Sequence, residues 1–159
     1  MRGLTIMQKL KKYSVLFVAL LLMMVTGCDS LFDTGDTEKV YDGPPQVAFF
    51  PLQREVGAGA GSTWVQVQLI ATAARTSDLT INFSADGAST AAAGTHYTLP
   101  SSSVVLPAGQ WTVNINVSLI AGSVPAGQER LLILNLDGTN QGDVEIAENL
   151  KRSRIFITG

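Results

Sequence analysis

Hydrophobic and polar residues alternate with period two in several short runs after residue 46. Between Trp111 and Leu119 every second residue is apolar, and the residues between them are Thr, Asn or Ser. Successive side chains of a β-strand point to opposite faces, so this alternation predicts a strand with one buried and one solvated face. We expect Ile115 in the core and Asn114 at the surface. Trp111 is in phase with Ile115 and is expected to help fill the core.

About seven such strands are expected in all, separated by clusters of Gly, Pro, Ser and Asp. The clearest lie at residues 47–52, 64–69, 79–84, 111–119, 128–136 and 154–158. Pro51 lacks a backbone N–H and favours an edge strand for the first of these. The more continuously apolar run at 128–136 is typical of a central strand covered on both faces. One sheet would leave its apolar face in water, so residues 46–159 are predicted to form an all-β, antiparallel Greek-key sandwich of Ig-like type.

The chain before residue 28 has a different pattern. Four basic residues and no acidic one precede a run of 11 apolar residues from Val15 to Val25. A membrane-spanning helix needs about 20 apolar residues, so this run is too short to span a bilayer. A cationic start followed by a short apolar core predicts a secretory signal peptide over residues 1–27.

Cys28 directly follows this segment and is the only cysteine in the sequence. The stretch Val25-Thr26-Gly27-Cys28 resembles the bacterial lipobox, which implies a diacylglycerol on Cys28 and anchorage to a membrane. A buried free cysteine fits poorly, because Asp29 and Ser30 follow it. A soluble protein cut by an ordinary signal peptidase is the main alternative. Residues 28–45 are expected to be a lipidated, acidic and flexible tether.

Charge narrows the range of partners. Of the 11 basic residues four lie in residues 1–27, so the remainder keeps seven basic against 13 acidic residues, a net charge of −6. An acidic chain is a poor candidate for binding nucleic acid. Without a second cysteine the core must be held by packing alone. No phosphate loop, zinc spacing or nucleophile elbow is present, so we expect no enzyme and no cofactor.

One part of the sequence carries a family signature. Its elements are Gly94-Thr95-His96-Tyr97, the apolar triplet 104–106, Pro107-Ala108-Gly109-Gln110, the alternating strand and the Leu-rich run that starts at Glu129. This order resembles the Calx-beta-like sandwich domains. Tyr97 suits a buried ring beside a turn. The layout of lipobox, acidic tether and one such domain is similar to uncharacterised surface lipoproteins of Bacteroidota-type bacteria.

Calcium-binding members of that family use clustered carboxylates, and here the pattern departs from theirs. His96 stands where the family has Asp, and Ala121-Gly122-Ser123 replaces the expected acidic residues. Glu129 remains, and Asp137, Asp143 and Glu145 could gather near one loop, yet a calcium ion needs about six to eight oxygen ligands. We therefore expect no metal site.

Two residue types remain as candidates for function. His96 is the only histidine, and without a partner it is expected to be a hydrogen-bonded structural residue rather than a catalytic one. Trp64 is out of phase with Val65 and Val67, so we expect it to be exposed and name it as the possible ligand-binding residue.

The sequence thus favours a lipid-anchored protein of the cell envelope, with a non-catalytic sandwich as an interaction or structural module. Asp29 directly after Cys28 favours retention in the inner membrane in some enteric-type bacteria, whereas acidic residues soon after the cysteine accompany surface export in Bacteroidota-type lipoproteins. Of the two locations we favour the outer membrane. A protein or a glycan is the expected partner. Two alternatives stay open: a carbohydrate-binding accessory of a polysaccharide uptake system, which needs an exposed aromatic platform, and a calcium-stabilised adhesion domain, which needs converging carboxylates.

Overall fold

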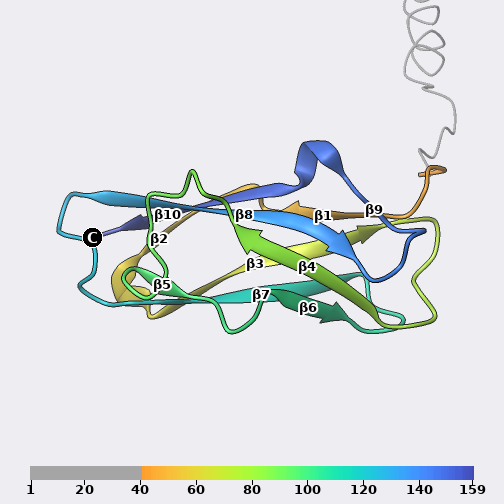
Figure 1. Ribbon diagram of the computed structural model, residues 1–159, viewed down its shortest axis with the longest axis horizontal. Coiled ribbons are helices and arrows are strands. Elements are labelled where there is room, and N and C mark those ends of the chain that lie inside the picture. The colour runs from red at the N-terminus through yellow and green to blue at the C-terminus, as the bar shows by residue number, and fades with distance from the viewer. Residues whose placement is uncertain (1–40) are drawn as a thin grey trace, which may run out of the picture. The chain divides into compact units, whose positions relative to one another are not determined.

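The computed structural model describes residues 41–159, and this part of the chain is built of β-strands (Figure 1). Ten strands follow one another, with one turn of 3-10 helix after β2 (η1, Ala58–Ala60) and another after β9 (η2, Glu148–Leu150). The strands are β1 Gln46–Phe50, β2 Gln53–Gly57, β3 Ser62–Ile70, β4 Leu79–Ala85, β5 Tyr97–Thr98, β6 Ser103–Leu106, β7 Thr112–Leu119, β8 Glu129–Thr139, β9 Glu145–Ile146 and β10 Arg152–Thr158.

The strands form two five-stranded sheets with a strict division between them. The odd sheet has the order β5-β7-β3-β1-β9, and the even sheet has the order β2-β10-β8-β4-β6. Consecutive strands therefore always lie in opposite sheets, and every connection within the described residues crosses the sandwich (Figure 1). The Gly and Pro clusters of the sequence are thus arches between the sheets and not hairpins within one sheet.

The predicted all-β sandwich is confirmed, with ten strands in place of about seven. The additional strands are β2 and the two-residue strands β5 and β9. The pairing is antiparallel except at two places, where β9 runs parallel to β1 and β10 runs parallel to β2. These two parallel pairs are exceptions within the predicted antiparallel sandwich, and local patterning does not specify them.

Apolar residues from alternate positions of both sheets fill the core. In β7 Ile115 is 2% exposed and its neighbour Asn114 is exposed, so the predicted register of this strand is correct. On β4 the alternate residues Leu79, Ile81 and Phe83 are buried in the same way. Tyr97 is also buried, as expected, and this burial raises the pKa of its phenol above the ordinary value.

The strand β8 is interior in the even sheet, between β10 and β4. Leu132 and Leu134 face the core, while Ile133 on the other face is 9% exposed. A segment after β4 covers Ile133, because Ser89 Oγ accepts a hydrogen bond from the Ile133 amide at 3.0 Å. The prediction of a central strand covered on both faces is therefore confirmed.

The chain changes sheets at Pro51, between β1 and β2. Because Pro51 has no N–H, it fits a position where a strand ladder is interrupted. The buried Ser153 of β10 donates a hydrogen bond to the Pro51 carbonyl at 2.9 Å and so ties the crossing to the even sheet. The edge-strand prediction holds only in part, since β9 pairs with β1 at Gln46 and Val47.

Candidate functional site

Trp64 lies on the outer face of the odd sheet. Its neighbours Thr63 and Val65 are buried, so the side chain of Trp64 must point outward, and it is 39% exposed. The guanidinium of Arg54 lies over the indole ring, 4.1 Å from its centroid. Arg54 Nη1 also donates a hydrogen bond to the backbone oxygen of Trp64 at 2.8 Å. This cation–π contact holds the indole and the guanidinium together at the surface.

The crossing at Pro51 explains why Arg54 reaches Trp64. β1 pairs with β3 only as far as Phe50 opposite Gln66, and then leaves the odd sheet. The next part of β3, at Trp64, therefore has no strand on that side. Arg54 comes from β2 in the even sheet and supplies the hydrogen-bond donor that the continuing strand would have supplied.

Further exposed side chains share this part of the outer face, which we call the aromatic face. Phe50 is 59% exposed, and the register places it opposite Gln66 and diagonal to Trp64. On the other side of β3, Asn116 pairs with Trp64 and Asn114 pairs with Gln66. The aromatic face consists of Phe50, Arg54, Trp64, Gln66, Asn114 and Asn116. It offers apolar rings beside amides that can both donate and accept hydrogen bonds.

Trp111 does not fill the core. Its side chain is 43% exposed, so the expectation drawn from its phase is wrong. β7 begins only at Thr112, and the Trp111 carbonyl accepts the last bond of the ladder from the Leu69 amide at 2.8 Å. Trp111 thus lies in the bend before β7, outside the regular alternation of that strand.

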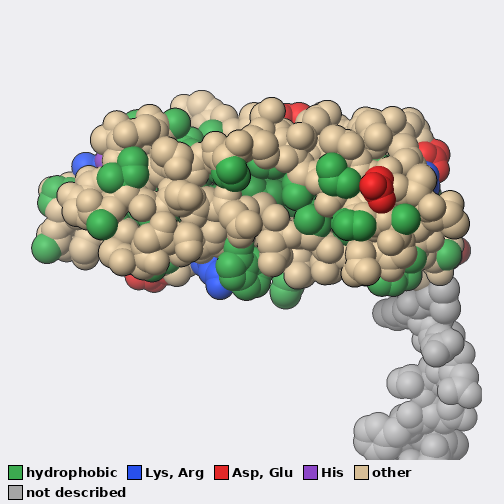
Figure 2. Space-filling model, turned by 90° about the horizontal axis from the view of Figure 1, so that it is seen from below, with side chains coloured by type: hydrophobic (Ala, Val, Ile, Leu, Met, Phe, Trp, Pro, Cys, Tyr) green, Lys and Arg blue, Asp and Glu red, His purple; other side chains and the backbone are tan. Residues whose placement is uncertain are grey.

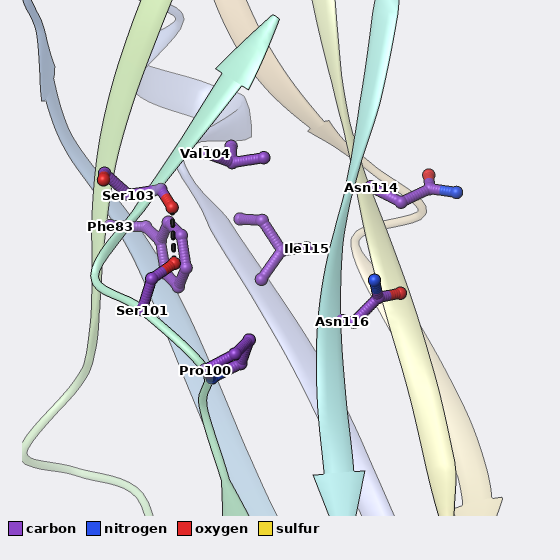
Figure 3. A pocket seen from close by; sticks show the side chains of 8 residues that line it. All are labelled: Phe83, Pro100, Ser101, Ser103, Val104, Asn114, Ile115 and Asn116. Atoms are coloured by element: carbon purple, nitrogen blue, oxygen red, sulfur yellow. Dashed lines mark hydrogen bonds between the residues drawn. The ribbon is translucent and has the colours of Figure 1, made fainter.

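A small cavity opens between β6 of the even sheet and β7 of the odd sheet. It has a volume of about 180 Å³, and Phe83, Val104 and Ile115 converge on it, whereas Asn114 and Asn116 point away from the gap (Figure 3). Figure 2 shows the side of the sandwich on which β6 and β7 lie, where charged side chains are few. The cavity lining contains no titratable side chain, so the cavity has no group for acid–base chemistry.

His96 takes part in the local backbone structure. Its Nδ1 accepts a hydrogen bond from the Ala92 amide at 2.9 Å, and its own amide donates to the Ala92 carbonyl at 2.9 Å. The His96 carbonyl accepts from the Ile120 amide at 3.0 Å. These bonds fit the expected structural role, in which the imidazole closes the loop before β5.

The carboxylates of the candidate calcium loop do not converge on one point. Asp143 pairs with Arg75 at 2.6 Å, and this bond lowers the pKa of its carboxyl. Asp137 accepts a hydrogen bond from Ser84 Oγ at 3.0 Å. Among residues 41–159 no three His, Cys, Asp or Glu side chains are close enough to hold a metal ion. Asp137 and Asp143 thus each contact a protein donor of their own.

Cys28, the predicted lipidation site, lies outside the described residues, as do the predicted signal peptide and most of the predicted tether. In the part of the chain that the structure describes, no helix is long and apolar enough to cross a membrane.

Comparisons with known proteins bear on the fold. No family model matches the sequence, and no curated protein matches it. The apo-form Calx CBD1 domain has a similar structure, with a TM-score of 0.59 and 18% identity over 73% of this chain and 97% of that chain. The calcium binding domain CBD12 of CALX1.1 has the same TM-score and identity, and the match covers 70% of this chain and 43% of that chain.

A protein from Bacteroides ovatus, provisionally described as carbohydrate binding, is similar with a TM-score of 0.52 and 14% identity. That match covers 71% of this chain and 36% of the other. At these identities the likeness concerns the fold alone. Residues 41–159 form a Calx-beta-like β-sandwich.

Proposed function

We propose that this chain is a lipid-anchored protein of the cell envelope whose β-sandwich is a non-catalytic binding module. The lipobox Val25-Thr26-Gly27-Cys28 supports the anchor, because it ends in the only cysteine and follows a signal-like segment. Two or three acyl chains hold a protein firmly to a bilayer, since each buried CH₂ contributes about 0.8 kcal/mol. The acidic residues after Cys28 favour the outer membrane as the location.

Acylation of Cys28 can be tested directly. Cys28→Ser should abolish incorporation of radiolabelled palmitate and move the protein from the membrane fraction to the soluble fraction. Ser30→Ala, two residues away, serves as the control and should remain labelled and membrane-bound. Continued labelling of the Cys28→Ser protein would refute the anchor.

Carbohydrate is the partner that we favour for the module. The observation that carries this choice is the aromatic face, where Phe50 and Trp64 are exposed beside the amides of Gln66, Asn114 and Asn116. Sugar rings pack their C–H faces on aromatic rings, and their hydroxyls pair with groups that both donate and accept hydrogen bonds. The fold shared with the Bacteroides ovatus protein is compatible with this role.

A glycan array probed with the full chain in detergent tests this choice. We expect binding to at least one class of saccharide, and we expect Trp64→Ala and Phe50→Ala to abolish it. Val105→Ala removes an exposed apolar residue from β6, away from the aromatic face, and should leave binding unchanged. An array without any signal, or binding that survives both aromatic substitutions, would contradict the proposal.

A further inference from the structure

The aromatic face carries one positive charge, and its neighbours do not neutralise it. Arg54 forms no ion pair within residues 41–159. The other outward-facing side chains of β3 and β7 are uncharged. They are Ser62, Trp64, Gln66, Gln68, Ile70, Thr112, Asn114, Asn116 and Ser118. The guanidinium of Arg54 therefore lies beside two strands whose outward-facing side chains carry no charge.

The contacts of Arg54 fix the position of its guanidinium and leave some of its N–H donors free. Stacking on Trp64 uses the flat face of the guanidinium, and one N–H is bonded to the Trp64 carbonyl. A guanidinium has five N–H donors, so further donors remain along its edge. Two parallel N–H groups match the two oxygens of a carboxylate, and an ordered arginine loses little entropy on binding one.

The spacing of the neighbouring groups suits a saccharide. Trp64 and Gln66 on β3 face Asn116 and Asn114 on β7, so one ring and three amides form a grid. Residues that face the same way are about 7 Å apart along a strand, and facing residues are about 5 Å apart across the pair. These spacings span one or two sugar units beside the guanidinium. Phe50, at 59% exposure, provides an aromatic surface that Arg54 does not cover.

From these observations we propose that the aromatic face binds an acidic saccharide. Arg54 donates hydrogen bonds to a carboxylate of the sugar, and the amides form hydrogen bonds with the hydroxyls of the same sugar. This inference rests on the carbohydrate-binding function proposed above. A nucleic acid fits the face poorly, because a single guanidinium neutralises only one phosphate. An acidic peptide would satisfy Arg54 but would leave the amide grid without hydroxyl partners.

The test compares acidic oligosaccharides with their methyl esters, which keep the sugar and remove the charge. Oligogalacturonate and alginate oligomers are titrated calorimetrically into the full chain in detergent. We expect at least one acid form to bind about tenfold more tightly than its ester, as one charge-assisted contact would give. Arg54→Gln should remove this preference and retain weak binding to both forms, whereas Arg54→Lys should retain part of it.

Arg154→Gln is the matched control, because Arg154 is exposed on β10 of the even sheet and should not affect the preference. Thermal melts establish that each variant is folded, and Trp64→Ala provides a second variant if Arg54→Gln does not fold. Equal affinity for acids and esters would overturn the acidic saccharide while leaving carbohydrate binding intact. Absence of binding to every saccharide, neutral ones included, would overturn both proposals. Tighter binding of oligoglutamate than of any saccharide would indicate an acidic peptide.

Discussion

Asp86 follows β4 and is held by several donors at once. Its Oδ1 accepts a hydrogen bond from the Ala88 amide at 2.8 Å, and its Oδ2 accepts from Asn135 Nδ2 at 2.9 Å. Arg152 Nη2 lies 3.3 Å from Oδ2. These contacts stabilise the ionised carboxylate and lower its pKa, the Ala88 amide most strongly. A single side chain thereby joins the end of β4 to β8 and β10.

The lowered pKa of Asp86 predicts a pH-dependent contribution to stability. A group whose pKa is lower in the folded state stabilises the fold above its unfolded pKa of 3.8, and the contribution is lost as the pH falls through the folded pKa. Asp86→Asn should therefore be less stable than the natural chain at pH 6, and the difference should vanish at strongly acidic pH. Denaturant melts from pH 6 to pH 2 measure this difference. A difference in the free energy of unfolding that does not change with pH would show that the charge of Asp86 does not contribute to stability.

At the scale of elements, one face of β7 packs into the core and the other face forms part of the proposed binding surface. The inner face of β7 packs into the core through Ile115, Val117 and Leu119, and its outer face contributes Asn114 and Asn116 to the aromatic face. A shift of register by one residue would exchange the two sets, so burial of the apolar set specifies the position of the amides. The stability of the core thus determines the geometry of the proposed binding face.

The register of β7 predicts opposite effects for neighbouring substitutions. Ile115→Ala removes buried methyl groups and should lower the free energy of unfolding by about 2–5 kcal/mol. Asn114→Ala changes an exposed side chain and should have an effect within about 0.5 kcal/mol. Urea melts of the two variants, with equal slopes, measure both values. Similar losses in the two would contradict the two-faced strand.

At the scale of the whole molecule, the sandwich is held by long-range pairing. Consecutive strands never share a sheet within residues 41–159, so each ladder joins segments that are distant in sequence. Most of the described acidic side chains near loops are engaged with protein donors, as Asp86, Asp137 and Asp143 illustrate. Packing between the sheets, without a disulfide, therefore supports the fold.

From these contacts we predict that the domain folds without calcium. EDTA should leave the melting temperature of the full chain in detergent nearly unchanged. An ion bound only by the folded state at a hundredfold excess over its dissociation constant would add about 2.7 kcal/mol. Its removal would lower the melting temperature by several degrees in a domain of this size. A fall of that size, reversed by added calcium, would reveal a metal site that the sequence does not indicate.

Local sequence patterns determined the fold class, the positions of the main strands and the burial of most of their side chains. Alternation predicted the all-β class and the opposite burial of Asn114 and Ile115, because side-chain direction in a strand is a local property. The continuously apolar run at 128–136 predicted the central position of β8. The same reasoning indicated an exposed Trp64. The predictions about Cys28 depend on a short motif and stay predictions.

Tertiary structure alone decided where strands end and which residues meet. Trp111 has the phase of a core residue, but it is exposed because it lies in the bend before β7 begins. Arg54 was not predicted to contact Trp64, because that contact exists only where β1 leaves the odd sheet and β2 enters the even one. The parallel pairings of β9 with β1 and of β10 with β2 likewise depend on contacts between segments that are distant in sequence. Such features depend on contacts between distant segments, which a period of two along the chain does not encode.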